Sequence, residues 1–125
     1  MATEMNHHEL LKLAAKAAGI QYDADASKPN PESGAFWGLW LEFYREPSVY
    51  VRRYWNPLTD NGDAFRLAVK LRLTVSWDRF NDEDYATATP PHTHQGYDFL
   101  VDQDPYAAAR CAIVLAASEI GKAMQ

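Results

Sequence analysis

Apolar residues recur at helical intervals near both ends of the chain. In residues 6–18 they form one stripe that follows Asn6, the predicted N-cap, which has the spacing of a capping box with Glu9. Gly19 comes at the position where a left-handed residue commonly ends a helix. In residues 104–124 a second stripe follows Asp104, the predicted N-cap, and Pro105, a residue favoured in the first helical turn. Its apolar face carries Ala109, Ala112, Ile113, Ala116, Ala117, Ile120 and Met124. The many alanines on this face predict close approach to the layer beneath it.

Alternating or aromatic-rich stretches predict strands in the rest of the chain. Residues 35–44 hold many bulky aromatic side chains, which favours a strand covered on both faces over a short amphipathic helix. Residues 48–54 and 72–77 alternate between apolar and polar side chains, as half-buried strands do. In the second of these, the side expected to be buried carries Leu73, Val75 and Trp77. Further short strands are predicted for residues 20–22, 85–89 and 97–101, with an acidic turn at residues 81–84 and a polar loop at residues 92–96.

Residues 55–71 join a turn to an amphipathic helix. Pro57 ends the preceding strand, because proline cannot donate a ladder hydrogen bond. Asp60 is placed as the N-cap of the helix, and Asp63 adds negative charge to its first turn. The pair Asn61-Gly62 could mark a hairpin in isolation, but the apolar residues after it fall at helical intervals. The sequence therefore predicts a helix here.

Three helices that must bury their apolar stripes against antiparallel strands predict a layered α+β domain. The chain has 125 residues, which fits a single domain over residues 1–125. This length is enough to bury a hydrophobic core without disulfides or metals. A hydrophobic content of 47% with 23% charged residues is typical of a globular protein.

The charge balance argues against nucleic-acid binding. The net charge is −5, whereas a protein that binds nucleic acid needs a basic face to neutralise phosphates. One local exception interleaves arginines with aromatic residues that could stack on bases: Tyr44, Arg45, Tyr50, Arg52, Arg53, Tyr54 and Trp55. We favour the simpler interpretation that these arginines lie on the solvated edge of a strand.

The single cysteine and the absence of long apolar runs indicate in which cellular compartment the protein is expected. Cys111 excludes an intramolecular disulfide, and its neighbours in a helical stretch predict a buried, unreactive thiol. No apolar run approaches the roughly 18 residues that a membrane span requires, and no apolar leader is present at the N-terminus. We therefore expect a cytoplasmic protein that does not enter a membrane.

Few residues form patterns that could carry chemistry. His92 and His94 would face the same way on a strand and could share a metal ion, although a polar loop explains them as well. Asp60 and Asp63 could act as paired carboxylates, but helix capping already accounts for both. No catalytic residue is therefore predicted. Trp55 could line a pocket at the strand-to-helix junction, or it could fill the core.

Residues 55–68 resemble the signature WNP…D-x-GDA-x-RLA of the phage ABA sandwich domain family, which comprises small proteins of tailed phages and prophages. The final helix, with Ala107-Ala108-Ala109-Arg110, and the first helix, ending in Ala18-Gly19-Ile20, are also similar to that family. The resemblance implies an α-β-α sandwich, with about four or five mostly antiparallel strands between helices, and a phage or prophage origin. It implies no activity and no catalytic residue.

Two functional hypotheses follow. The first is a non-enzymatic accessory protein that binds a protein partner, or another copy of itself, in the bacterial cytoplasm and uses no cofactor. The alternative is a small nucleotide-binding protein or metal-dependent enzyme with a site near Trp55, Asn56, His92 and His94. The candidate ligand-binding residues are Trp55, Asn56, Asp60, Asp63 and Arg66.

Overall fold

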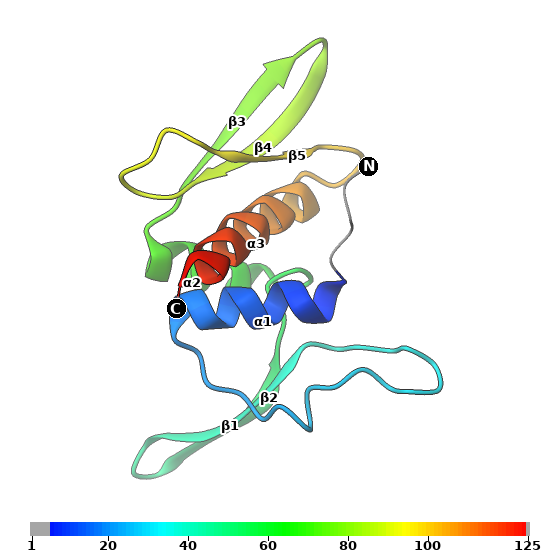
Figure 1. Ribbon diagram of the computed structural model, residues 1–125, viewed down its shortest axis with the longest axis vertical. Coiled ribbons are helices and arrows are strands. Elements are labelled where there is room, and N and C mark those ends of the chain that lie inside the picture. Colours follow the sequence, from blue (N-terminus) through cyan, green and yellow to red (C-terminus); the bar gives the residue numbers. More distant parts are fainter. Residues whose placement is uncertain (1–5, 125) are drawn as a thin grey trace.

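The computed structural model describes residues 6–124 and has the α+β fold that the sequence predicts (Figure 1). Within these residues there are three helices, α1 (His7–Ala18), α2 (Asn61–Leu71) and α3 (Pro105–Ala123). Two antiparallel sheets accompany them. The first is a two-stranded ribbon of β1 (Leu39–Glu46) and β2 (Val49–Trp55); the second contains β3 (Thr74–Phe80), β4 (Glu83–Thr89) and β5 (Tyr97–Leu100) in that order.

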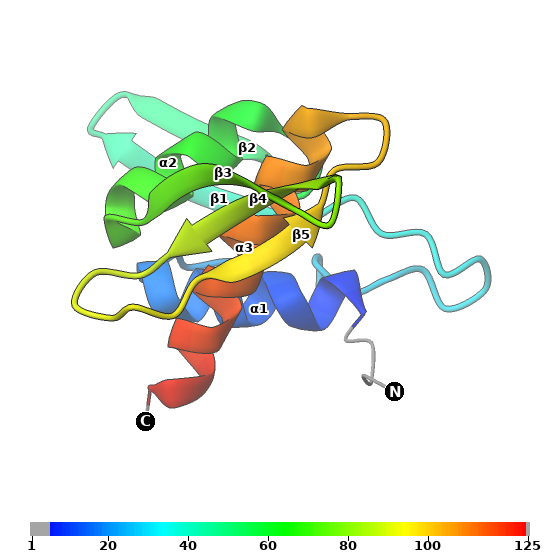
Figure 2. The ribbon, with the colours of Figure 1, turned by 90° about the horizontal axis from the view of Figure 1, so that it is seen from above.

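The helices lie between the two sheets. In Figure 1 the three-stranded sheet is at one end of the molecule, the ribbon is at the other, and α1 and α3 lie in the middle. Seen from above, β3, β4 and β5 lie over α3 (Figure 2). The strands predicted from the sequence are therefore divided into two groups, and each group covers a different side of the helical layer.

Helix α3 is at the centre of the core, and more than one of its faces is buried. Its predicted apolar face is buried at Ala112, Ile113, Ala116 and Ala117, whereas Met124 is exposed. Burial extends beyond that face to Ala108, Val114, Ser118 and Gly121. The reason is that α3 packs against α1 on one side and against β4 and β5 on another. A single apolar stripe is therefore an incomplete description of this helix.

Small residues let α1 and α3 approach closely. Ala14 and Ala15 of α1 are fully buried. A Cβ atom added at Gly121 would lie 2.1 Å from the carbonyl oxygen of Leu13, which is far inside van der Waals contact. The backbones of the two helices therefore touch at Gly121, where no side chain fits between them.

Replacing Ala116 by leucine is expected to destabilise the protein by roughly 1–3 kcal/mol, because the site is fully buried and has no room for added methylenes. Urea unfolding monitored by circular dichroism measures the change. Ala123→Leu, at an exposed position in the last turn of the same helix, is the matched control and should have little effect. Equal stability of the two variants would contradict the tight packing around α3.

The ends of the helices follow the predicted caps. Asn6 Oδ1 accepts a hydrogen bond from the Glu9 backbone N–H at 2.8 Å, and Gly19 adopts a left-handed conformation with φ 71°. Asp60 caps α2, so the helical interpretation of the Asn61-Gly62 pair is confirmed. Asp104 caps α3 through the Tyr106 N–H at 2.9 Å. These local signals were reliable because each involves neighbouring residues only.

The prediction of a strand, and not a helix, within residues 35–44 is confirmed by β1, but its predicted start and burial were wrong, and the strand predicted for residues 20–22 is not formed. β1 begins at Leu39, later than predicted, and it is covered on one face only, at Leu39 and Leu41. A ribbon that packs one face on helices leaves the other in solvent, so the aromatic density did not signal burial. Residues 20–22 form no strand; the neighbouring Asp23 makes an isolated bridge to Trp40 instead.

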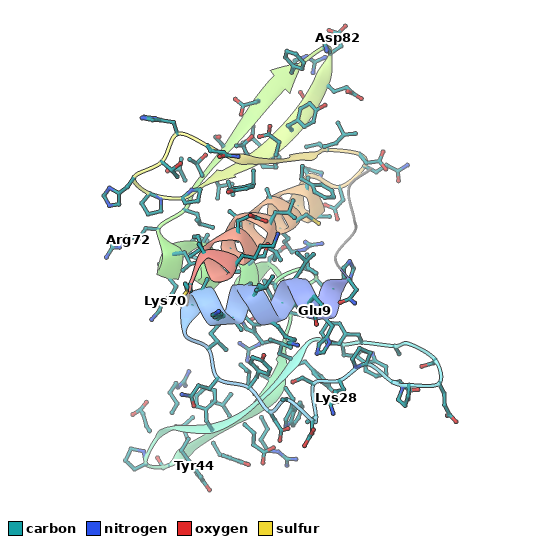
Figure 3. The ribbon with its side chains drawn as sticks, viewed as in Figure 1. Glu9, Lys28, Tyr44, Lys70, Arg72 and Asp82 are labelled. Atoms are coloured by element: carbon teal, nitrogen blue, oxygen red, sulfur yellow. The ribbon has the colours of Figure 1, made fainter. Side chains whose placement is uncertain are left out.

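The three-stranded sheet also departs from the prediction. Val75 and Trp77 were expected to be buried, but both are exposed. β3 is an edge strand, and the β3–β4 hairpin extends beyond the helices to a tip at Asp82 (Figure 3). The acidic turn is shorter than predicted, because only Asn81 and Asp82 have positive φ while Glu83 already belongs to β4.

Candidate functional site

β2 joins α2 through a turn whose side chains point inward. Trp55 ends β2 and is buried in the core. Asn56 is also buried: its Oδ1 accepts a hydrogen bond from the Leu58 N–H at 3.0 Å, and its Nδ2 donates to the Trp37 carbonyl at 3.2 Å. Trp55 therefore fills the core and Asn56 fixes the turn, so neither side chain is turned toward solvent.

A buried carboxylate fastens the end of β2 to the first turn of α2. Asp63 is 1% exposed and accepts hydrogen bonds from the Asn56 N–H at 2.9 Å and from Arg66 at 2.8 Å. Arg53 donates to both of its oxygens, at 2.8 and 3.2 Å. Asp60 caps the same turn by accepting from the Asp63 N–H at 2.8 Å. We call Arg53, Asn56, Asp63 and Arg66 the Asp63 cluster.

The Asp63 cluster keeps its carboxyl group ionised. Burial alone would raise the pKa of Asp63, but the hydrogen bonds from Arg53, the Asn56 N–H and Arg66 outweigh it and lower that pKa below the ordinary value. The hydrogen bond to Asp63 raises the pKa of Arg53 in turn. A carboxylate held in this way is a permanent charge that positions two arginines, and it is unsuited to exchanging protons near neutral pH.

All five candidate ligand-binding residues lie at this joint between β2 and α2. Trp55, Asn56 and Asp63 are buried, whereas Asp60 and Arg66 are exposed. Arg53, which also binds Asp63, was not among the predicted site residues. The spacing in the sequence could have indicated it, because Arg53 is two residues before Trp55 and side chains at this spacing share one face of a strand.

His92 and His94 do not lie on a strand. They occupy the exposed loop before β5, where His92 has a φ of 64°. Their loop joins β4 to β5 of the three-stranded sheet, whereas Trp55 ends β2 of the ribbon and Asn56 follows it; the helices separate the two sheets (Figure 1). Within residues 6–124, no three His, Cys, Asp or Glu side chains are placed to hold a metal ion.

Burial raises the pKa of the Cys111 thiol, which disfavours its thiolate.

A cleft of about 1040 Å³ opens beside the Asp63 cluster, between the ribbon and the helices. We call it the ribbon cleft. Its cationic side chains are Arg53, Arg66 and Lys70, and its apolar lining includes Ile20, Leu41, Phe43 and Leu67. In Figure 3, Lys70 projects from α2 on the same side of the molecule as Tyr44 at the tip of the ribbon.

The outer face of the ribbon presents an exposed row of aromatic side chains. The cross-strand register pairs Trp40 with Tyr54 and Tyr44 with Tyr50, with ring centroids 5.0 and 4.7 Å apart. Tyr44 is 70% exposed, and Trp37 adds a further ring beside Tyr54. We call this surface the aromatic face, comprising Trp37, Trp40, Glu42, Tyr44, Tyr50, Arg52 and Tyr54.

A charged pair lies in the middle of the aromatic face. Glu42 is opposite Arg52 and accepts hydrogen bonds from the Tyr50 hydroxyl and from Trp40 Nε1. These hydrogen bonds lower the pKa of Glu42. The Arg52 guanidinium lies 5.8 Å from the centroid of the Trp40 ring, a cation–π distance. The side chains of this face are therefore arranged by contacts with one another.

No helix within residues 6–124 is both long and apolar enough to cross a membrane. Comparisons of the chain with protein-family models, with curated proteins and with solved structures found no match.

Proposed function

We propose that this chain is a non-enzymatic binding protein that contacts a protein partner through the aromatic face of the ribbon. The observation that carries the proposal is the exposure of that face, where tyrosines, tryptophans and an arginine lie side by side in solvent. Aromatic residues and arginine are enriched at protein interfaces, and Trp, Tyr and Arg dominate their binding energy.

The chemistry of the aromatic face favours a protein over a nucleic acid. Arg52 is balanced by Glu42 directly opposite, so the centre of the face carries no net positive charge. Arg53 lies on the other face of β2, where it binds Asp63. The arginines of the ribbon therefore do not form one basic surface that could follow a phosphate backbone.

The setting that we propose is the cytoplasm of a bacterial host, with the protein acting as a phage or prophage accessory factor. The support is the resemblance of residues 55–68 to the phage signature, together with a sequence that has one cysteine and so forms no internal disulfide. The partner is then a host or phage protein, or a second copy of this chain.

The double variant Tyr44→Ser/Tyr50→Ser is expected to lose partner binding while it stays folded. Truncating side chains at the centre of an interface typically costs at least about 2 kcal/mol, or roughly thirtyfold in affinity. Immobilised wild-type and variant proteins are compared by quantitative mass spectrometry of what each captures from bacterial lysate. Circular dichroism checks that the variant is folded.

A matched control is the double variant Phe65→Ser/Tyr106→Ser, which removes two exposed aromatic rings from α2 and α3. Its captured proteins should equal those of the wild type. If the ribbon variant captures the same proteins as the wild type, the aromatic face is not the interface.

Binding of single-stranded oligonucleotides that falls steeply with salt would instead favour the nucleic-acid alternative. Sedimentation of the purified protein identifies the case in which the partner is a second copy.

A further inference from the structure

The ribbon cleft gathers cationic side chains in a chain that is acidic as a whole. The net charge of the protein is −5, yet Arg53, Arg66 and Lys70 all line this cleft. Arg53 comes from the inner face of β2, and the other two are four residues apart on α2. Like charges at this spacing lie one above the other on a helix and repel each other. Asp63 is paired with both arginines and Asp60 lies 4.0 Å from Arg66, so Lys70 supplies the cationic charge that these two carboxylates do not balance.

Asp63 holds the side chains of Arg53 and Arg66 in place. Asp63 accepts hydrogen bonds from both guanidinium groups, at 2.8 Å in each case. Their side chains remain 42% and 63% exposed, and each guanidinium uses only part of its N–H donors on Asp63. Within residues 6–124, Lys70 forms no ion pair. Donors therefore remain available to a bound molecule, and they are already oriented.

The two acidic side chains that line the cleft, Glu42 and Asp23, accept hydrogen bonds from groups other than the three cations. The Glu42 carboxylate accepts hydrogen bonds from Trp40 and Tyr50 on the outer face of the ribbon. Asp23 Oδ1 accepts from the Ala26 N–H at 2.9 Å within its own turn. Neither carboxylate makes an ion pair with the cleft cations.

The remaining lining of the cleft is apolar. Ile20 and Leu67 lie on the helical side, and Leu41 and Phe43 lie on the ribbon side. We propose that the ribbon cleft binds a small organic anion: a carboxylate or phosphate held by Arg53, Arg66 and Lys70, carried on an apolar or aromatic body that packs between the two walls. Glu42, Tyr44 and Tyr50 of the aromatic face also border this cleft, but the three cationic side chains are not part of that face. The anion site therefore goes beyond the proposed protein binding.

Phenyl phosphate and benzoate are the probes, with benzyl alcohol as the neutral control of similar shape. Each is titrated into ¹⁵N-labelled protein, and NMR follows the backbone amides and the arginine Nε–Hε signals. Phenyl phosphate or benzoate should shift Arg53, Arg66 and the amides around Lys70, and benzyl alcohol should not. The probe that binds more tightly shows whether the site prefers phosphate or carboxylate. Binding should weaken as sodium chloride is raised, because salt screens exposed charges.

Charge reversal at Lys70 separates this site from general surface attraction. Lys70→Glu should weaken phenyl phosphate binding by about tenfold or more, since it brings a negative charge against the anion and leaves the Asp63 cluster intact. Lys28→Glu, which makes the same charge change on the loop at residues 24–34, should leave binding within about twofold. The proposal is overturned if neither anion shifts the arginine signals at millimolar concentration, if benzyl alcohol shifts them equally, or if the two variants behave alike. None of these outcomes measures the binding of a protein partner, and the variants leave Tyr44 and Tyr50 in place, so the two proposals fail independently.

Discussion

Replacing Asp63 by asparagine is expected to destabilise the protein by about 3 kcal/mol. The substitution keeps the shape of the side chain but removes a charge that is 1% exposed and satisfies Arg53, Arg66 and a backbone N–H together. Removing one member of a buried ion pair commonly costs 3–5 kcal/mol, because its partners lose their compensation. We place the cost at the lower end, since both arginines are partly solvated.

Urea unfolding of wild type and Asp63→Asn at neutral pH measures this cost. Asp84→Asn is the matched control, because it removes a carboxylate whose 2.8 Å ion pair with Arg79 is exposed on both sides. Exposed pairs contribute about 0–1 kcal/mol, so the control should lose little stability. Similar losses in the two variants would show that the Asp63 cluster does not hold β2 and α2 together.

The same cluster predicts a pH dependence with a definite sign. The pKa of Asp63 is lower in the folded protein than in the unfolded chain, where a carboxyl titrates near about 3.9. Its stabilising contribution is therefore complete above that value and is lost as the pH falls through the lowered pKa of the folded state. The free energy of unfolding of Asp63→Asn should consequently fall less steeply in acid than that of the wild type.

Gly121→Ala is expected to destabilise the protein by about 3 kcal/mol, although the same exchange inside a helix normally stabilises by about 1 kcal/mol. The reversed sign follows from the backbone contact: the new Cβ would lie 2.1 Å from the Leu13 carbonyl oxygen, and backbone cannot move aside as a side chain can. Either α1 and α3 separate, which opens the core around α3, or the contact strains both helices.

Thermal and urea unfolding of Gly121→Ala test this expectation, with Gly62→Ala as the control. Gly62 is in the first turn of α2, and the nearest atoms to an added Cβ would be the ends of two side chains, Arg66 at 3.1 Å and Asp60 at 3.2 Å. The control should be neutral or slightly stabilising. A Gly121→Ala protein that is as stable as the wild type would mean that α1 and α3 do not touch at this residue.

The sequence predicts the helices well, because their signals are local. Asn6, Asp60 and Asp104 cap the helices that follow them, and Gly19 ends the first one. Each of these signals depends on hydrogen bonds within a few residues. The class of the fold follows from the same patterns, since alternating strands and amphipathic helices must be layered.

Burial was harder to predict, because it depends on elements distant in sequence. The aromatic residues of β1 were interpreted as buried, but hydrophobicity does not reveal whether a second layer will cover a strand. Among residues 6–124, no helix or sheet covers the outer face of this ribbon. Asp63 was interpreted as a charge in the first turn of a helix. Its main partner, Arg53, comes from the preceding strand, so only the tertiary arrangement shows that the carboxylate is buried.

The ribbon joins the rest of the molecule at one end only. Its base is anchored by Leu39, Leu41, Trp55 and the Asp63 cluster, whereas the half beyond Glu42 has no fully buried residue, and no strand within the described residues 6–124 lies beside it as a third. Two strands without further support are only marginally stable in water. Local opening of this half therefore costs less free energy than unfolding of the whole domain. A partner that binds the aromatic face must also offset the entropy of keeping the ribbon closed, which favours complexes that form and dissociate readily.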